Sequence, residues 1–420
     1  MLDAGVPSTS LKSAVSGSRA PELAELGVSA FSEPEPGGVV DDMTTTGGDR
    51  INGRKRREPT ADAAGYQDRE GLGGTAQPQR SRSTIVITHL SGAQMAFFGI
   101  RFDMRMPATA PGTRADRYAA SVDMVEWADS LGFVTAILSE HHGSPDGYLP
   151  SPLPLAAAMA ARSSNIRIGI SAMVSSFHDP LRLAEDVAVV DLISGGRLDL
   201  TLTNGYVSSE FEMFDVPLSK RAARTTEAVA TLKQAWTGEP FEFRGRTVQV
   251  LPTPAQVGGP PISLGGSVEA AARRAARIAD GFIPSIPEIW EFYVDECAKL
   301  GKPDPGPYMG GDTSVIHVAT NVDQGWDELA PYAMHEVNAY GDWAASAGIE
   351  GATGFVRVND SDALRATGQY RVVTPEELVA ELTEKGPFAF CMLHPLVGGL
   401  PPEFAWKSLK LIETQVIPNL

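Results

Sequence analysis

Residues 134–174, VTAILSEHHGSPDGYLPSPLPLAAAMAARSSNIRIGISAMV, predict a strand, a polar loop, a helix and a second strand. The run 134–138 is continuously apolar, which is typical of a strand buried on both faces. The helix expected over 151–163 is rich in alanine, and Pro152 and Pro154 fall in its first turn, where proline is tolerated. Two buried strands joined by a helix form the repeating unit of a parallel sheet.

The same alternation continues on both sides of this unit, and residues 95–420 hold about eight β/α units. This number predicts an α/β fold, specifically a TIM (β/α)8 barrel with insertions. An open doubly wound sheet is the alternative, but its usual Gly-x-Gly-x-x-Gly does not follow the first strand. Strands are expected at 97–100, 197–203, 262–264, 282–283, 315–320 and 388–393, helices at 116–131, 180–193, 219–236, 268–279, 289–300, 326–347, 375–385 and 404–416, and a small hairpin at 241–250.

Residues 1–94 differ in composition from the rest of the chain. They are rich in Gly, Ser, Thr, Pro and charged residues and contain only short apolar pieces. Such a segment cannot bury enough apolar surface to offset the entropy of ordering it. We therefore expect a disordered or non-native N-terminal extension before the barrel at 95–420. A start at Met43 or Met95 is the other interpretation.

The overall composition excludes several classes of partner. The net charge of −17 disfavours nucleic acid and anionic membrane surfaces, because both attract basic proteins. Cys297 and Cys391 have no metal-ligand spacing, which is consistent with a cytoplasmic protein that lacks a disulfide framework or zinc site. The chain also lacks an apolar run long enough to span a membrane and an apolar signal-peptide core.

Titratable residues gather in the loop after the second expected strand, at Glu140, His141 and His142. In a (β/α)8 barrel, chemistry takes place on the loops that follow the strands. A histidine there can act near neutral pH as an acid, a base or a hydrogen-bond donor. Packing and solvation of these side chains is the alternative. A metal site is disfavoured, because adjacent histidines project in different directions and no third ligand is spaced nearby.

Gly265, Gly266 and Ser267 join an apolar strand directly to a helix. Free amides at a helix start, together with the helix dipole, suit a phosphate. The glycines permit close approach of the backbone, and Ser267 is expected as N-cap and ligand. An ordinary turn with a capping serine is the alternative. The Gly195-Gly196 turn before the fourth strand is expected to be structural, and His178 is expected to be a helix-entry residue.

These pieces, in this order, resemble the luciferase-like monooxygenase family. The resemblance covers roughly residues 97–420 and does not extend to the N-terminal segment. Each motif alone is weakly specific, whereas the ordered set is specific. The matching motifs are Glu140-His141-His142, the run 179–186, the run 191–198, Asn204-Gly205-Tyr206 with Glu210-Phe211, Gly265-Gly266-Ser267 with the run 273–276, and Asp280-Gly281-Phe282.

The resemblance implies reduced FMN lying across the strand ends, with its phosphate held after strand five. Gly265, Gly266, Ser267 and Ala270 match the phosphate cup, and Asn204 and Tyr206 match contacts to the phosphate or ribityl chain. Bacterial luciferase has an arginine at the position of Asn204, so one charge partner is replaced here. A bulge or non-prolyl cis peptide beneath the flavin ring is expected at Ser171-Ala172.

His141 matches the family's catalytic histidine, which is expected to manage a proton near flavin C4a or N5 as oxygen adds. The activity implied is monooxygenation of a small organic substrate by reduced FMN and O2. Because the chain lacks a Rossmann fingerprint for NAD(P)H, a separate flavin reductase is expected to supply the reduced flavin. A homodimer is common among relatives. The segment 348–371 is expected to be a surface insertion, with a substrate lid as the alternative.

Three other functions remain open from the sequence. Members of the same superfamily use a deazaflavin coenzyme for hydride transfer, and Asn204 leaves that option open. A metal-dependent barrel hydrolase would use Glu140, His141 and His142. A non-catalytic flavin-binding protein is the last alternative. The sequence does not name the substrate, choose between FMN and deazaflavin, fix the oligomeric state or indicate light emission.

Overall fold

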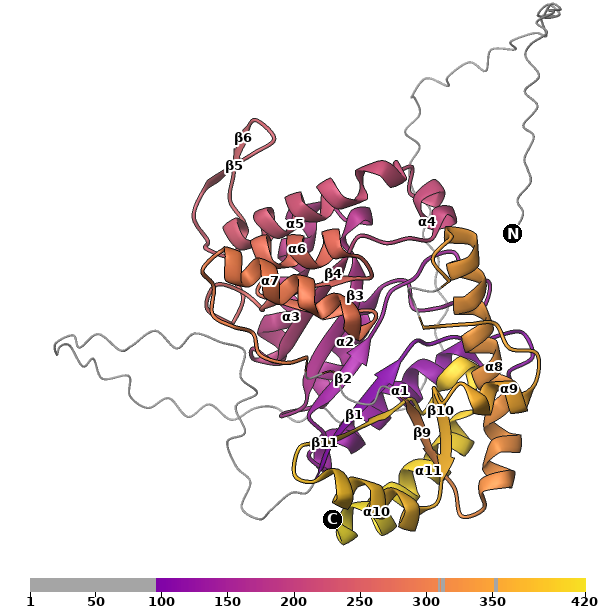
Figure 1. Cartoon of the computed structure of the whole chain (residues 1–420). Coiled ribbons are helices and arrows are strands. Elements are labelled where there is room, and N and C mark those ends of the chain that lie inside the picture. Colours follow the sequence, from indigo (N-terminus) through magenta and orange to yellow (C-terminus); the bar gives the residue numbers. More distant parts are fainter. Residues whose placement is uncertain (1–95, 309, 311–313, 351–353) are drawn as a thin grey trace, which may run out of the picture. The chain divides into compact units, whose positions relative to one another are not determined.

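Nine parallel strands form the main sheet among the residues that the computed structural model describes, namely 96–308, 310, 314–350 and 354–420 (Figure 1). The strand order is β10-β9-β11-β1-β2-β3-β4-β7-β8. Consecutive strands are joined by helices, so the predicted α/β barrel is confirmed. The strands are β1 (Ala96–Phe102), β2 (Thr135–Leu138), β3 (Arg167–Val174), β4 (Leu198–Thr203), β7 (Ile262–Gly266), β8 (Gly281–Pro284), β9 (Val315–Val318), β10 (Tyr370–Val373) and β11 (Ala389–Leu393).

The helices contact one another in chain order from α1 through α2, α3, α5 and α6 to α7. Their small and branched apolar residues fill the space between helices and strands; Ile100, Leu138 and Ile168 are fully buried there. The principal helices are α1 (Arg114–Ser130), α2 (Pro152–Arg162), α3 (Pro180–Ser194), α4 (Ser208–Met213), α5 (Arg221–Ala235), α6 (Glu269–Ile278), α7 (Trp290–Lys299), α8 (Val322–Ala347), α9 (Ser361–Ala366), α10 (Pro375–Lys385) and α11 (Pro402–Leu411).

Several local predictions are confirmed. The turn before β4 places Gly195 at φ 64° and Gly196 at φ 86°, in the left-handed region that favours glycine. The predicted hairpin is the antiparallel pair β5 (Phe241–Phe243) and β6 (Arg246–Val248). Within the described residues, no helix is long and apolar enough to cross a membrane.

The segment expected as an insertion has more structure than the sequence predicted. Residues 361–366 form α9. The last two residues of the segment, 370 and 371, belong to β10, which pairs with β9 at the end of the main sheet. The run YRVV is short, and polar residues precede it, so apolar periodicity did not single it out. The prediction of a simple surface insertion is therefore wrong for this part. The N-terminal extension at 1–94 lies outside the described residues.

Candidate active site

The loops that carry the predicted site residues follow the carboxyl ends of neighbouring strands. Strands β2, β3, β4 and β7 are neighbours in that order and all run parallel. Their carboxyl ends therefore meet at the same end of the barrel, where (β/α)8 enzymes place their chemistry. The register pairs Leu138 with Ile170, Ser171 with Thr201 and Leu202 with Leu264.

The backbone of β3 is irregular at the predicted position. The Ser171–Ala172 peptide bond is cis, and the pairing with β4 shifts register between Ser171 and Met173. The loop after β2 is bound to this point. Ser139 Oγ donates to the Ser171 carbonyl at 2.7 Å, and the Glu140 amide donates to the Ala172 carbonyl at 3.2 Å. The predicted cis peptide thus lies directly beside the histidine-bearing loop.

His141 is held by a carboxylate from α4. Its Nδ1 lies 2.8 Å from Glu210 Oε1, which also accepts the His142 amide at 2.8 Å. A carboxylate accepts hydrogen bonds, so Nδ1 of His141 donates to Glu210, and Nε2 is the ring nitrogen available to another partner. The side chain of Glu210 is 1% exposed and that of His141 is 12% exposed. Glu210 therefore fixes the orientation of the His141 ring.

Aromatic rings surround the imidazole of His141. The ring of Trp343 lies 4.4 Å away between centroids, and that of Tyr148 lies 4.9 Å away. Tyr206 and Tyr340 each lie 6.0 Å away. The structure thus brings the predicted residues His141 and Tyr206 together. Four aromatic rings within 6.0 Å make the surroundings of this histidine largely apolar, which strengthens electrostatic interactions with any reacting group.

Glu140 organises the two remaining histidines of this rim. Its Oε1 lies 2.8 Å from His142 Nε2 and 2.9 Å from His178 Nε2, and its Oε2 accepts the Val174 amide at 2.7 Å. Burial tends to raise the pKa of Glu140, but the hydrogen bonds from both histidines hold the pKa below its ordinary value. His178, expected as a helix-entry residue, thus also holds this carboxylate. Of the residues in the metal-hydrolase alternative, Glu140 and His142 bond each other and His141 bonds Glu210, which gives no support to a metal hydrolase.

The glycine-rich turn after β7 opens toward the start of α6. The N-cap of α6 is Val268, which makes no side-chain capping bond, so the expectation that Ser267 caps this helix is wrong. A Cβ atom on Gly266 would lie 2.4 Å from the Ala271 Cβ, so only glycine fits there. Ala270 lies in the first turn of the helix. The amides around Ser267 and Ala270 are therefore not capped by a side chain of the N-cap residue.

A half-buried arginine of α6, to which the sequence analysis gave no role, contacts Asn204. Arg274 Nη2 donates to Asn204 Oδ1 at 3.2 Å, and its Nε is buried without a hydrogen-bond partner. Burial and the neighbouring charges of Arg277 and Arg221 lower the pKa of Arg274. An anion would relieve both effects. Arg274 on α6 thus places a guanidinium group beside Asn204.

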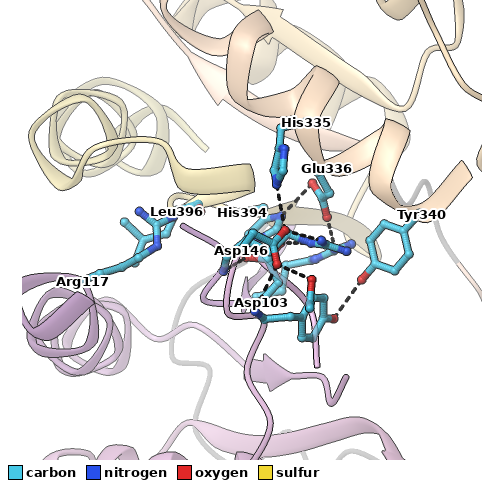
Figure 2. Close-up of polar contacts among 12 residues, drawn as sticks. Asp103, Arg117, Asp146, His335, Glu336, Tyr340, His394 and Leu396 are labelled. Carbon is cyan, nitrogen blue, oxygen red and sulfur yellow. Dashed lines mark hydrogen bonds and ion pairs between the residues drawn. The ribbon is translucent and has the colours of Figure 1, made fainter. Parts of the chain in front are cut away.

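A second polar cluster, also missed, lies where β1 ends (Figure 2). Glu336 on α8 accepts from Arg101 at 2.7 Å and from the Tyr370 hydroxyl at 2.9 Å. Asp103, Glu336 and His394 bring ligand atoms within 4.8 Å of one another, a donor set that suits a metal ion. Guanidinium groups already pair with both carboxylates, so we interpret the cluster as an ion-pair network.

Comparisons with known proteins agree with this architecture. The structure superposes on the monooxygenase RslO1 from Streptomyces bottropensis with a TM-score of 0.60 and 25% sequence identity, over 77% of this chain and 99% of that chain. The oxygenase component of the flavin-dependent trigonelline monooxygenase of Acinetobacter baylyi is 29% identical, over 36% of this chain and 43% of that protein. An F420-dependent glucose-6-phosphate dehydrogenase of Nakamurella multipartita is 30% identical, over 71% of this chain and 91% of that protein.

The match to several curated relatives is partial. The chain matches 49% and 39% of the lengths of two uncharacterized proteins of Sinorhizobium fredii. The family model described as luciferase-like monooxygenase, by contrast, matches residues 97–386 without interruption. This range includes His141, the cis peptide and the turn after β7. The chain belongs to the luciferase-like monooxygenase family.

Proposed function

We propose that this protein is a monooxygenase that uses reduced FMN and O2 to oxidise a small organic substrate. The observation that carries the proposal is the unpartnered, buried Nε of Arg274 beside the uncapped start of α6. A phosphate monoester there would receive amide hydrogen bonds and charge-assisted hydrogen bonds together. Gly265, Gly266, Ser267, Ala270 and Asn204 would complete the proposed phosphate site, and Ser171, Ala172 and Tyr206 would contact the rest of the flavin.

The flavin, when bound, would supply the redox chemistry, and the chain would supply binding, orientation and proton management. Glu210 fixes the His141 ring through Nδ1, which leaves Nε2 to accept or return a proton at the reacting atom. The aromatic rings of Tyr148, Tyr206 and Trp343 exclude water from the same space. This arrangement protects a water-sensitive reaction at the strand ends.

A separate reductase would deliver the reduced flavin. The relative from Acinetobacter is named as an oxygenase component, which supports a two-protein system for this chain as well. Hydride transfer with a deazaflavin coenzyme is the second candidate, favoured by the relative from Nakamurella, which matches a longer part of the chain. Purified protein titrated anaerobically with photoreduced FMN and with the deazaflavin coenzyme would separate them. Tight binding of the deazaflavin and none of reduced FMN would overturn the first proposal.

Replacement of Arg274 is expected to weaken FMN binding selectively. A hydrogen bond to a charged group is worth about 1.5–3 kcal/mol, so Arg274→Gln should raise the FMN Kd by roughly 10- to 150-fold. Riboflavin has no phosphate, so its Kd should stay the same. Fluorescence titration of both flavins measures the two values.

Arg277→Gln provides the matched control on the same helix. Arg277 pairs with Glu296 at 2.5 Å and is half exposed, so this variant removes equal charge without removing the donor beside Asn204. Its FMN affinity should match that of the unmodified protein. Equal losses of FMN and riboflavin affinity in Arg274→Gln would indicate a general structural effect and would contradict the phosphate site.

A further inference from the structure

We propose that Arg101 and Arg105, at the carboxyl end of β1, bind a carboxylate group of the substrate. The inference rests on the proposed function and names the class of molecule that the same site would oxidise. Arg101 is the second-last residue of β1, and it pairs in register with Ile137 of β2. Arg105 follows β1 by three residues and His141 follows β2 by three residues, so the two arginines and His141 lie at the carboxyl ends of adjacent strands.

The guanidinium of Arg105 has a donor without an acceptor. Its Nη1 donates to Asp146 Oδ2 at 2.6 Å and its Nε faces Asp103 Oδ2 in an ion pair at 3.4 Å, but Nη2 is buried without a hydrogen-bond partner. The whole side chain is 0% exposed. A buried donor without a partner destabilises the protein, and a bound oxygen atom would remove that cost. Arg101 is the accessible member of the pair, because its side chain is 26% exposed while one Nη donates to Glu336.

Aromatic rings connect Arg105 to His141. The Arg105 Cζ lies 4.6 Å from the ring of Tyr148, 4.8 Å from that of Tyr340 and 4.7 Å from that of Trp343. These are the rings that also contact the His141 imidazole. An oxygen atom held by the guanidinium would thus place the rest of its molecule along this aromatic wall toward Nε2 of His141. The wall favours a flat, apolar body.

The two tyrosines add a hydroxyl donor at the same place. The hydroxyl oxygens of Tyr148 and Tyr340 lie 2.8 Å apart and share one hydrogen bond (Tyr340 in Figure 2). Burial raises the pKa of both phenols, so both keep their hydrogens. One bond uses one hydroxyl hydrogen, which leaves the other for a ligand oxygen.

The charges of the cluster indicate a monoanion. Three carboxylates, those of Asp103, Asp146 and Glu336, lie among the guanidinium groups of Arg101, Arg105 and Arg117 and the imidazoles of His335 and His394. Arg117 donates to the carbonyls of Leu396 and Leu400 and not to a carboxylate. Burial tends to lower the pKa of His394, but the charges of Glu336 and Asp103 raise it, and protonation of His394 gives the cluster one more positive than negative charge. A carboxylate matches that surplus and the planar guanidinium, whereas a phosphate dianion exceeds it.

Benzoate tests this inference, because it joins a flat apolar ring to a carboxylate. Its binding to the full chain would be followed by tryptophan fluorescence, with Trp343→Phe identifying the signal. Benzamide is the neutral isostere and phenyl phosphate the dianion. Benzoate is expected to bind at least about tenfold more tightly than either, and Arg101→Gln should remove this preference. Arg101→Lys keeps the positive charge that pairs with Glu336, so this variant should fold and should keep part of the preference for benzoate.

Arg162→Gln is the matched control, because Arg162 lies on the exposed end of α2 and pairs only with Asp123 and Glu126. It should keep the full preference for benzoate. Equal Kd values for benzoate and benzamide, a preference that survives in Arg101→Gln, or no saturable benzoate binding would each overturn the inference. FMN titrations of the same samples distinguish failure of this inference from failure of the proposed function. A protein that prefers benzoate but binds no flavin would contradict the proposed function and not the carboxylate site.

Discussion

Replacement of His141 by alanine is expected to lower kcat by about 10²- to 10⁴-fold, the usual contribution of a general acid or base. The ring is oriented by Glu210 at 2.8 Å and shielded by aromatic neighbours, so alanine removes a positioned proton acceptor. FMN affinity should stay close to that of the unmodified protein, because the proposed phosphate contacts lie elsewhere, around Ser267 and Arg274. Steady-state turnover with FMN, a flavin reductase and an accepted substrate provides the measurement.

His141→Gln is the informative companion variant. Glutamine keeps a polar side chain of similar length that can bond Glu210, but it cannot take up a proton near neutral pH. A loss as large as that of alanine would indicate proton transfer. Recovery of most turnover in the glutamine variant would instead mean that His141 only donates a hydrogen bond. Full turnover in His141→Ala would contradict the assignment of His141 altogether.

Replacement of Glu336 by glutamine is expected to lower the free energy of unfolding by about 3–5 kcal/mol, the usual cost of breaking a buried ion pair. The carboxylate is 1% exposed and faces Arg101, Tyr370 and His394, so the change leaves cationic groups uncompensated inside the barrel. Denaturant unfolding at neutral pH measures the loss. Glu381→Gln is the control, since Glu381 pairs with Arg371 near the surface and should contribute about 0–1 kcal/mol.

The loss in Glu336→Gln should depend on pH in a defined direction. Burial tends to raise the pKa of Glu336, but the charges of His394 and Arg101 outweigh burial and lower the pKa below its ordinary value of 4.5. A lowered pKa gives stability that is present above pH 4.5 and declines as the pH falls below it. The difference between the two proteins should therefore shrink on acidification. A difference that grows toward low pH would contradict this account.

Much of the fold could be predicted from local sequence because its units are local. Each of these elements can be recognised from a few residues of local sequence. Examples are the apolar run before Glu140, the prolines at the start of α2 and the glycine turn before β4. The barrel and the luciferase-like monooxygenase family are confirmed. The short α4 and β10 were missed, because neither has the length that makes periodicity visible.

The polar partners of the site could not be predicted in the same way. Arg101 and Glu336 are 235 residues apart in the chain, and His141 and Glu210 are 69 apart. The contacts between these residues depend on which strands are neighbours and on how far each side chain extends. The spacing of residues in the sequence indicates neither of these. The resemblance located the cis peptide at Ser171–Ala172 and included Arg274 in the matching run 273–276, but it did not indicate the contact of Arg274 with Asn204.

The strand order also has a mechanical consequence. The sheet begins at β10 and ends at β8, so within the described part of the chain the ladder is interrupted between these two short strands. A fully closed barrel would pair every strand with two neighbours. Here the two end strands, β10 and β8, leave a seam between them, and β8 pairs with β7, the strand that leads into the glycine turn. Backbone amides along the seam should exchange their hydrogens with solvent earlier than those of β2 and β3, and the barrel should begin to loosen there.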